Sequence, residues 1–435
     1  MKTLRRLGRT LTVVALLAGI AGATQGSATT STKYYTATLT PGTASAGSTY
    51  NATYVLRNST QSTQSLGSAN VTPPAGFTLT AAGPASAPAG KTWTAAVVAN
   101  VLQLRSATNN DTLTPGQSVS VPISATVPTA SGTYTWTSVV KQANDFQGPP
   151  GNNFLLEPGA SFPTTTVTAG PAHHLAFTVQ PSLTKVNVAI SPAVEVTIYD
   201  QFGNVATGET GNVSLTLQHD PTDPTPGNGT LGGTTSKAAT AGVARFDNLT
   251  VSAISNRYYL RAAYGSITQD SGYFDVVDQV IPCGDNGCSG SVDNGQNTLT
   301  VNVPARQGTS GFLGLSLDQP AGPVACTRLD GSTINQQVLG SLQTVLPPAG
   351  YDTPSIQVVV RYDKSIAPGT GVANFIFCAN HGGNTPFFEI PACPRRGQPT
   401  QKCEQDRRRN GVGDLVVTFL FSSTDPVGGG YGGSP

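Results

Sequence analysis

The six cysteines are the residues of this sequence with the clearest capacity for chemistry, and all of them follow Pro282. An even number gathered in one part of a chain predicts disulfide bonds, although six cysteines allow fifteen sets of pairings. We favour three bonds, which are Cys283–Cys288, Cys326–Cys378 and Cys393–Cys403. The first and last pairs are close in sequence and leave the middle pair by elimination, and the connectivity itself stays open.

A zinc site is the competing interpretation of these cysteines. Cys378-Ala-Asn-His381 has the spacing of two zinc ligands, and Cys283 and Cys288 could supply two more thiolates. Structural zinc sites, however, usually place two to four residues between the ligands of both pairs, and export exposes thiols to oxidation. Disulfides are therefore the better prediction.

Carboxylates and amides near the first cysteine pair offer a second metal alternative, calcium. The oxygen ligands would come from Asp285, Asn286, Asp293 and Asn294. The regular spacing of a calcium-binding loop is missing, and Asn-Gly and Asp-Asn are ordinary turn residues. We expect no metal and no other cofactor.

Six of the 24 basic residues gather in one short stretch, which we call the basic cluster. Its members are Arg395, Arg396, Lys402, Arg407, Arg408 and Arg409, and only Glu404 and Asp406 oppose them. Such a cluster is a candidate contact for an anionic wall polymer or for phospholipid headgroups, and salt would screen each exposed contact. A solvated loop beside a disulfide is the simpler interpretation.

The sequence contains no recognised catalytic motif. The motif expected around a nucleophilic serine is Gly-x-Ser-x-Gly. Gly308-Thr-Ser-Gly311 is one residue short of this motif. There is no His-Glu-x-x-His and no phosphate-binding glycine loop before a helix. His173 and His174 lie at a junction between predicted modules, where packing explains them better than ligation. We expect no enzyme, and the alternative is a hydrolase with a carboxylate or metal site in the C-terminal domain.

The elements that must position these residues are strands. In Val119–Val127 every second residue is apolar, which places the apolar side chains on one face of a strand. Trp93–Leu104 and Tyr134–Val140 are each predicted to form one strand. Seven or eight such segments occur between residues 33 and 170 and predict a β-sandwich, the first module.

Two further modules follow with the same alternation. The second, residues 171–278, contains the turn Asp200-Gln-Phe-Gly-Asn204 between two predicted strands. The third, residues 279–427, holds all six cysteines and is predicted to be a disulfide-bonded, loop-rich sandwich. Residues 428–435 form a Gly-rich tail that we expect to be a disordered end.

The first residues of the chain have the pattern of a secretory signal peptide. Lys2, Arg5, Arg6 and Arg9 precede an apolar run, and Ala21-Gly22-Ala23 is a small-x-small cleavage pattern. The run of about 13 apolar residues would cover roughly 20 Å as a helix, short of the roughly 30 Å of a bilayer core. We expect residues 1–23 to be removed, residues 24–32 to be a linker, and the mature chain to be secreted or held at the cell surface without a transmembrane segment.

The composition agrees with an all-β chain. Only 11% of the residues are charged, while glycine and proline number 49 and 32, and these two residues disfavour helix interiors. The net charge of +1 removes the electrostatic argument for a nucleic-acid partner.

Three segments of the second module carry a resemblance to a known family. They are His174-Leu-Ala-Phe-Thr-Val-Gln-Pro-Ser182, Ile190-Ser-Pro-Ala-Val-Glu-Val-Thr-Ile-Tyr-Asp-Gln-Phe-Gly-Asn204 and Gly242-Val-Ala-Arg-Phe-Asp-Asn-Leu-Thr250. They resemble a bacterial immunoglobulin-like repeat that occurs in tandem in large exported proteins, especially of actinobacteria. Thr114-Pro-Gly-Gln-Ser-Val-Ser-Val-Pro-Ile123 in the first module looks like a related repeat.

The third module resembles a terminal module of similar secreted proteins. Ala392-Cys-Pro-Arg-Arg396, Lys402-Cys-Glu-Gln-Asp-Arg407 and Gly413-Asp-Leu-Val-Val-Thr-Phe-Leu420 carry this resemblance, which implies that Cys393 pairs with Cys403. These families are associated with surface display, adhesion and spacing, and they bring no catalytic residues to transfer.

The sequence therefore predicts three tandem immunoglobulin-like β-sandwich domains after a signal peptide, acting as a non-catalytic structural or adhesive protein of the cell envelope or extracellular matrix. Its partner would be an envelope polymer, a glycan or a protein, and self-association through strand edges is possible. The binding-module alternative is polysaccharide recognition by exposed aromatic residues such as Tyr258, Tyr259 or Tyr351.

Overall fold

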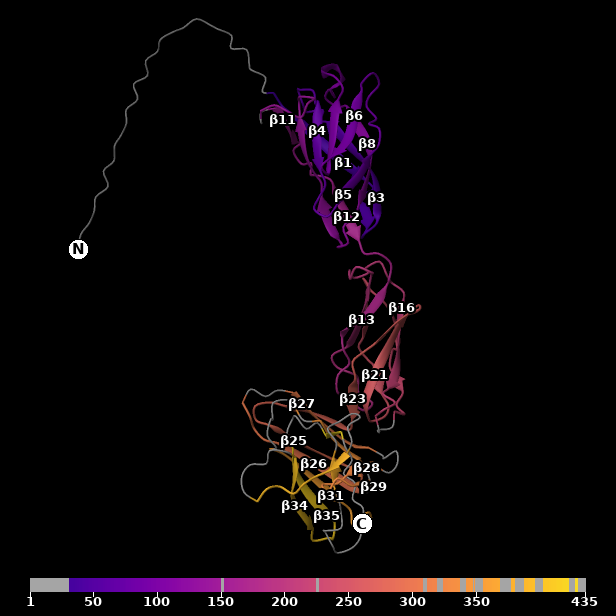
Figure 1. Cartoon of the computed structure of the whole chain (residues 1–435), viewed down its shortest axis with the longest axis vertical. Coiled ribbons are helices and arrows are strands. Elements are labelled where there is room, and N and C mark those ends of the chain that lie inside the picture. Colours follow the sequence, from indigo (N-terminus) through magenta and orange to yellow (C-terminus); the bar gives the residue numbers. More distant parts are fainter. Residues whose placement is uncertain are drawn as a thin grey trace, which may run out of the picture. The chain divides into compact units, whose positions relative to one another are not determined.

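The computed structural model is built almost wholly of β-strands (Figure 1). It describes residues 31–149, 152–223, 227–307, 311–318, 324–336, 342–346, 348, 355–367, 377–379, 387–395, 402–421 and 427–428. The predicted signal peptide, nearly all of the linker and most of the Gly-rich tail lie outside these residues. Within the described ranges the helical structure is a single 3-10 turn, Asn109–Asp111, and no helix is long and apolar enough to cross a membrane.

The chain divides into two compact units. The first contains Asn51–Ala125, Thr135–Thr164 and the segment that ends at Pro41. The second contains Gly42–Tyr50, Thr126–Tyr134 and the chain from Thr165 onward. The second and third modules therefore share one compact unit, although each has its own buried apolar cluster.

The strands of the first module form a nine-stranded sheet in the order β5-β8-β3-β1-β11-β10-β4-β7-β6 and a three-stranded sheet in the order β2-β12-β9. Their bounds are β1 (Tyr34–Thr40), β2 (Thr43–Ser45), β3 (Thr49–Asn58), β4 (Ser68–Thr72), β5 (Thr78–Ala82), β6 (Trp93–Val98), β7 (Val101–Ser106), β8 (Ser118–Thr126), β9 (Gly132–Thr135), β10 (Thr137–Lys141), β11 (Asn153–Leu156) and β12 (Thr164–Thr168). β11 pairs in parallel with β1 and antiparallel with β10, so it joins the two halves of the nine-stranded sheet along one side of the sandwich.

In this module the apolar side chains that alternate along the sequence are buried, as predicted. In β8, Val119, Val121, Ile123 and Ala125 are buried while the residues between them are not. Every second side chain therefore packs into the core, as the pleat requires.

Two strand predictions in the first module are wrong. Residues 93–104 form not one strand but a hairpin of β6 and β7, because Ala99 and Asn100 both adopt positive φ, 48° and 62°, the conformation of a two-residue turn. Residues 134–140 are divided at Trp136, whose side chain is fully buried and whose backbone N–H donates to Pro163 outside the β10 ladder.

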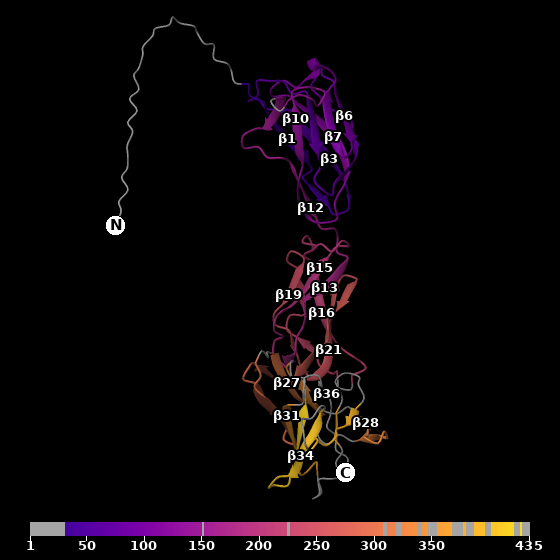
Figure 2. The same ribbon diagram turned by 60° about the vertical axis from the view of Figure 1, so that its left-hand side comes forward.

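The described residues of the second module form eleven strands, and β13, β15 and β19 make up one of its sheets (Figure 2). The bounds are β13 (His174–Val179), β14 (Thr184–Lys185), β15 (Val194–Tyr199), β16 (Asn212–His219), β17 (Leu231–Gly232), β18 (Ser236–Ala238), β19 (Val243–Phe246), β20 (Thr250–Val251), β21 (Ser255–Tyr264), β22 (Ile267–Asp270) and β23 (Phe274–Val277). The facing sheet has the order β14-β23-β21-β16-β18, with β22 beside β21.

The turn predicted at Asp200–Asn204 is built around a buried carboxylate. Asp200 accepts hydrogen bonds from the backbone N–H groups of Phe202, Asn204 and Gly170 and from the Asn204 side chain, at 2.8 to 2.9 Å. Burial alone would raise the pKa of Asp200, but these donors hold it at about 2. The carboxylate therefore fixes both the turn and the chain that enters β13.

Replacing Asp200 by asparagine is expected to lower the free energy of unfolding by about 2 kcal/mol at pH 7, because an amide cannot accept all four of these hydrogen bonds. Since folding depresses the pKa of Asp200, its contribution is complete above the unfolded-state value of about 3.9 and is lost as the pH falls toward 2. Urea titrations at pH 7 and pH 2.5 should show the difference between wild type and variant shrinking in acid; a constant difference would contradict this assignment.

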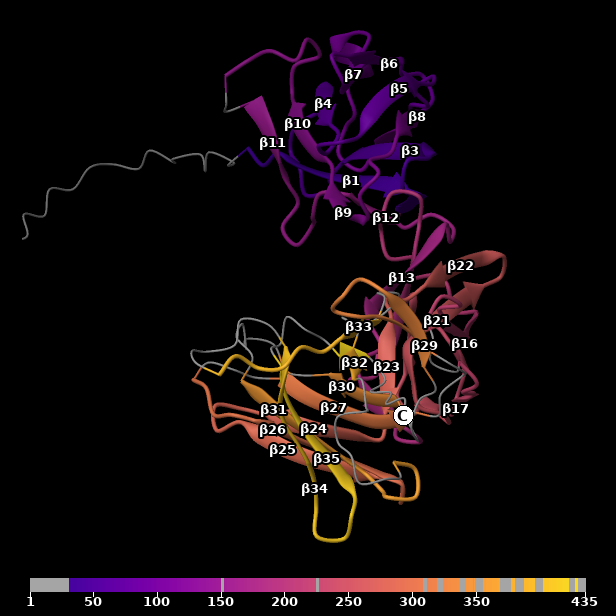
Figure 3. The same ribbon diagram turned by 60° about the horizontal axis from the view of Figure 1, so that its bottom comes forward.

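The described strands of the third module form one five-stranded sheet and two four-stranded sheets, and β25, β26, β31, β35 and β34 lie side by side in the five-stranded one (Figure 3). The bounds are β24 (Gln279–Cys283), β25 (Cys288–Asp293), β26 (Asn297–Val303), β27 (Gly311–Asp318), β28 (Val324–Thr327), β29 (Thr333–Gln336), β30 (Leu342–Leu346), β31 (Ile356–Tyr362), β32 (Cys378–Ala379), β33 (Phe387–Glu389), β34 (Cys403–Arg409), β35 (Leu415–Phe421) and β36 (Val427–Gly428). Between this five-stranded sheet and the β24-β27-β30-β36 sheet lies an apolar core that includes Tyr362, Phe377, Phe419 and Phe421.

Candidate functional site

All six cysteines are paired in the third module, in the same three pairs that the sequence favours. Cys283–Cys288 joins the end of β24 to the start of β25, and Cys393–Cys403 ties the segment before β34 to that strand. Cys326–Cys378 links β28 to β32 across a sequence separation of 52 residues. Cys378 is therefore not available as a zinc ligand, and His381, its proposed partner, lies outside the described residues.

The members of the basic cluster are placed in different environments. Lys402 is buried, and Arg407 and Arg409 are half-buried, while Arg395 and Arg408 are exposed. Arg396 lies outside the described residues. The structure thus leaves two described members of the cluster on the surface, and Arg408 forms an ion pair with Asp406.

Two arginines of this cluster support the third module from its edge strand, β34. Arg407 donates to Glu404 at 2.8 Å, and its guanidinium lies 4.7 Å from the centre of the buried Phe377 ring. Arg409 donates to the carbonyl oxygens of Ala367 and Gly413 at 2.6 and 2.9 Å. Because these guanidinium groups are engaged within the module, they act first as structural groups.

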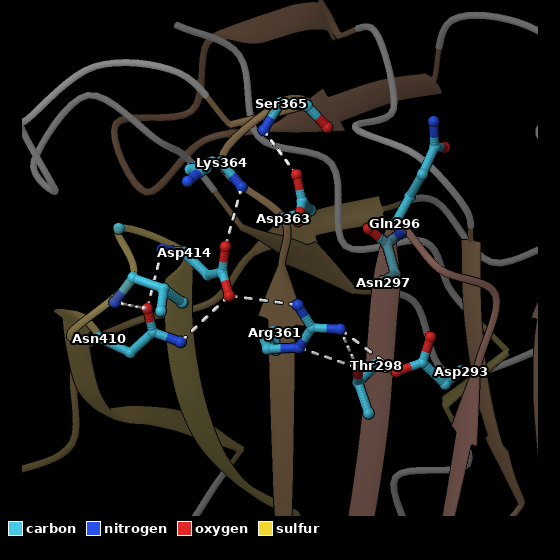
Figure 4. Close-up of polar contacts among 12 residues, drawn as sticks. Asp293, Gln296, Asn297, Thr298, Arg361, Asp363, Lys364, Ser365, Asn410 and Asp414 are labelled. Atoms are coloured by element: carbon cyan, nitrogen blue, oxygen red, sulfur yellow. Dashed lines mark hydrogen bonds and ion pairs between the residues drawn. The ribbon is translucent and has the colours of Figure 1, made fainter.

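A polar network surrounds Arg361 near the end of the five-stranded sheet (Figure 4). Its guanidinium donates to Asp414 and to Asp293, each at 3.2 Å, and to the Thr298 hydroxyl at 2.7 Å. We call Asp293, Thr298, Arg361, Asn410 and Asp414 the Arg361 network.

Strand register explains why these residues meet. Asp293 on β25 lies opposite Thr298 on β26, and Thr298 lies opposite Arg361 on β31. Arg361 in turn lies opposite Val416 on β35, two residues after Asp414. The network therefore crosses four adjacent strands and links their turns.

Hydrogen bonds saturate the two carboxylates of the network. Asp414 accepts from the Asn410 side chain and from the Lys364 backbone N–H, both at 3.1 Å, and these bonds together with Arg361 hold the pKa of Asp414 below its ordinary value. Hydrogen bonds from Thr298 and Gly295, followed by Arg361, likewise lower the pKa of Asp293. Both groups are thus kept as anions, which suits an ion-pair network and not a general acid at neutral pH.

Replacing Arg361 by leucine is expected to cost about 2 kcal/mol of unfolding free energy, since the nearly buried Asp414 loses its guanidinium partner. Because the folded-state pKa of Asp414 is depressed, the cost should decline as the pH falls through that value. Arg261→Leu removes a more exposed ion pair, with Asp270, and is the matched control with a smaller effect. Equal losses in urea titrations of the two variants would contradict the structural role of Arg361.

Calcium ligation was the alternative for this end of the third module, and the structure shows the contacts of two of the four candidate residues, Asp293 and Asn294. The Asn294 side chain accepts from the backbone of Gln296 and Asn297, and Asp293 is held by the Arg361 network. Among the residues that the structure describes, no group of three or more His, Cys, Asp or Glu side chains is arranged to hold a metal ion.

The histidines do not form a catalytic group in the described ranges. His173 packs edge-on against His174, which stacks on Tyr199. His219 Nε2 lies 3.1 Å from the Ser255 hydroxyl, a contact between β16 and β21 that sequence spacing could not reveal. Ser255 is only 1% exposed, so its hydroxyl has no access to a substrate and the pair is part of the packing.

The aromatic residues considered for glycan recognition also lie in different environments. Tyr258 is buried in the core of the second module, whereas Tyr259 is partly exposed and packs edge-on against the exposed Tyr273 at 5.7 Å. Arg257 lies over the Tyr273 ring at 4.1 Å. Tyr351 lies outside the described residues. The sequence prediction missed Tyr273, which is distinguished by its exposure rather than by a motif.

Comparisons with solved structures find proteins of low sequence identity, among them adhesins and cohesins. The Escherichia coli adhesin FdeC is 13% identical, with 89% of this chain and 88% of that chain covered and a TM-score of 0.31. The C-terminal domain of the AgI/II polypeptide BspA of Streptococcus agalactiae is 8% identical, with 55% and 99% covered and a TM-score of 0.27. A non-cellulosomal cohesin of Archaeoglobus fulgidus is 16% identical, with 31% and 91% covered and a TM-score of 0.22.

No model of a known protein family and no curated protein matches the sequence. The assignment of fold consequently depends on the strands, registers and cores of the chain itself. On that basis the protein is an all-β chain of β-sandwich modules.

Proposed function

We propose that the protein is an exported, non-catalytic structural or adhesive element of the cell envelope or extracellular matrix. The observation that carries this proposal is that polar side chains of the modules form structural hydrogen bonds. The Arg361 network, Arg407 and the buried Asp200 all do so. The three disulfides support the exported location, because such bonds persist in oxidising compartments.

In this role the sandwiches act as rigid spacers, and binding occurs through loops and outer sheet faces. The partner would be an envelope polymer, a glycan or a protein. Of the basic cluster, Arg395 and Arg408 are the exposed described members with which an anionic polymer could form salt-sensitive contacts.

Deletion of the gene in the producing cell, with cell fractionation of the wild type, tests this proposal. We expect the protein in the surface, matrix or culture fraction, and we expect the deletion to reduce adhesion of the cells or to alter their envelope. Recovery of the protein in the cytoplasm, or a hydrolytic activity lost with the deletion and restored by the purified protein, would refute it.

Polysaccharide binding is a second candidate, favoured by the pair of the partly exposed Tyr259 and the exposed Tyr273. Sugars commonly pack on aromatic rings, and the polar side chain of Gln218 lies opposite Tyr259 in the ladder between β16 and β21. On a glycan array, Tyr259→Ala with Tyr273→Ala should abolish binding, while Tyr134→Ala in the first module should leave it unchanged. A wild-type protein that binds no glycan would remove this candidate.

A further inference from the structure

A pocket of about 400 Å³ lies between the loop that follows β13 and the sheet that begins with β24. Both walls belong to the second compact unit. Its lining includes Leu183, Lys185, Val188, Val280 and Phe312. Its volume is within the range of about 300–1,000 Å³ that holds small organic ligands.

Strand register gives this pocket an apolar floor. Val280 lies opposite Gly314 and Pro282 lies opposite Phe312, so these four residues share one face of the β24-β27 pair. Ile281, Leu313 and Leu315 point to the other face, where they pack with the core of the third module. Val280 and Phe312 are thus apolar residues on the outer face of the sheet.

Gly314 allows the loop that follows β13 to approach the sheet closely. A Cβ atom at this position would lie 3.2 Å from Cδ2 of Leu183, so the absence of a side chain lets Leu183 approach the sheet. Leu183 then forms an apolar wall beside the floor of Val280 and Phe312. Phe312, which is 58% exposed, and the exposed Val188 both line the pocket.

One cation lies at the edge of this apolar surface. Lys185 is exposed on the short edge strand β14, and it makes no ion pair with any residue in the described part of the chain. The pocket lining contains no carboxylate, and its other polar side chains are the hydroxyls of Ser182, Thr184 and Ser191. This charge pattern favours a ligand with an apolar body and a single negative end.

We propose that this pocket binds a medium-chain carboxylate, with the hydrocarbon chain between Leu183, Val280 and Phe312 and the carboxylate beside the Lys185 ammonium. Burial of the chain supplies most of the affinity, and the ion pair sets its orientation. This inference goes beyond the proposed structural role and does not depend on it.

Calorimetric titration of the mature chain with octanoate, with 1-octanol as the uncharged comparison, tests the proposal. We expect saturable octanoate binding with a Kd on the order of 0.1–1 mM, the range for a ligand of about ten heavy atoms. Octanol should bind about fivefold more weakly, because it lacks the charge that pairs with Lys185.

Three variants locate the site. Lys185→Gln should weaken octanoate binding about fivefold without changing octanol binding, and Phe312→Ser should weaken both about tenfold. Lys237→Gln, a lysine elsewhere in the second module that pairs with Asp247, is the matched control and should leave the Kd within about twofold. Both pocket residues are exposed, so their replacement leaves the cores intact.

The proposal is overturned if octanoate shows no saturable binding, if octanol binds as tightly as octanoate, or if Lys185→Gln and Lys237→Gln weaken binding equally. None of these outcomes bears on whether the protein is exported or adhesive, so the two proposals fail separately.

Discussion

Replacing Cys326 and Cys378 together by alanine lowers the free energy of unfolding of the third module by about 4 kcal/mol. The bond closes a loop with a sequence separation of 52 residues, and the chain-entropy model gives about 4 kcal/mol for a loop of that length. Urea titration followed by far-ultraviolet circular dichroism measures this loss. It is large against the 5–15 kcal/mol by which a typical domain is stable.

The double replacement of Cys393 and Cys403 is the matched control, since its loop spans only 10 residues and should contribute about 2–3 kcal/mol. If the short-loop variant proved less stable than the long-loop variant, constraint of the unfolded chain would not be the main source of stability in this module.

Replacing Phe77 by alanine lowers the stability of the first compact unit by about 3–5 kcal/mol. Phe77 is buried and packs edge-on against the fully buried Trp136 at 5.4 Å, so alanine leaves a cavity beside that ring. Both tryptophans of the chain, Trp93 and Trp136, lie in this unit. Tryptophan fluorescence in urea therefore reports its unfolding without a signal from the rest of the protein.

Leu155→Ala on β11 is the control for this measurement, because Leu155 is exposed in the same unit and should change stability by less than about 0.5 kcal/mol. The first module contains no cysteine, so a reducing agent should leave the fluorescence transition unmoved while it destabilises the third module. A fluorescence midpoint that shifts on reduction would mean that the two units do not unfold independently.

Much of the fold could be predicted because strand alternation is a local property. The alternating apolar residues of Val119–Val127 correspond to β8, and Asp200–Asn204 forms the predicted turn. The hairpin of β6 and β7 was missed because its turn, Ala99-Asn100, contains no glycine, and alanine rarely adopts positive φ. Asn100, a residue that tolerates positive φ, was the one propensity signal to divide that segment.

The polar sites were less predictable because their partners come from distant strands. Arg361 and Asp414 are 53 residues apart and meet only through the register of β31 and β35. The one available signal was the turn residues, Asp293-Asn-Gly295 and Asn410-Gly411, at strand ends. Likewise, counting charges found the basic cluster but could not show that Arg407 and Arg409 are directed at Glu404, Phe377 and backbone carbonyls.

The central claim is that the protein acts outside the cytoplasm as disulfide-bonded β-modules without a reactive centre. Intact mass spectrometry of the native protein, after alkylation without reduction, tests it most directly. We expect the protein recovered from the surface or culture fraction to begin after Ala23 and to carry no alkyl group on its six cysteines. A full-length protein confined to the cytoplasm, with thiols that react, would contradict the account.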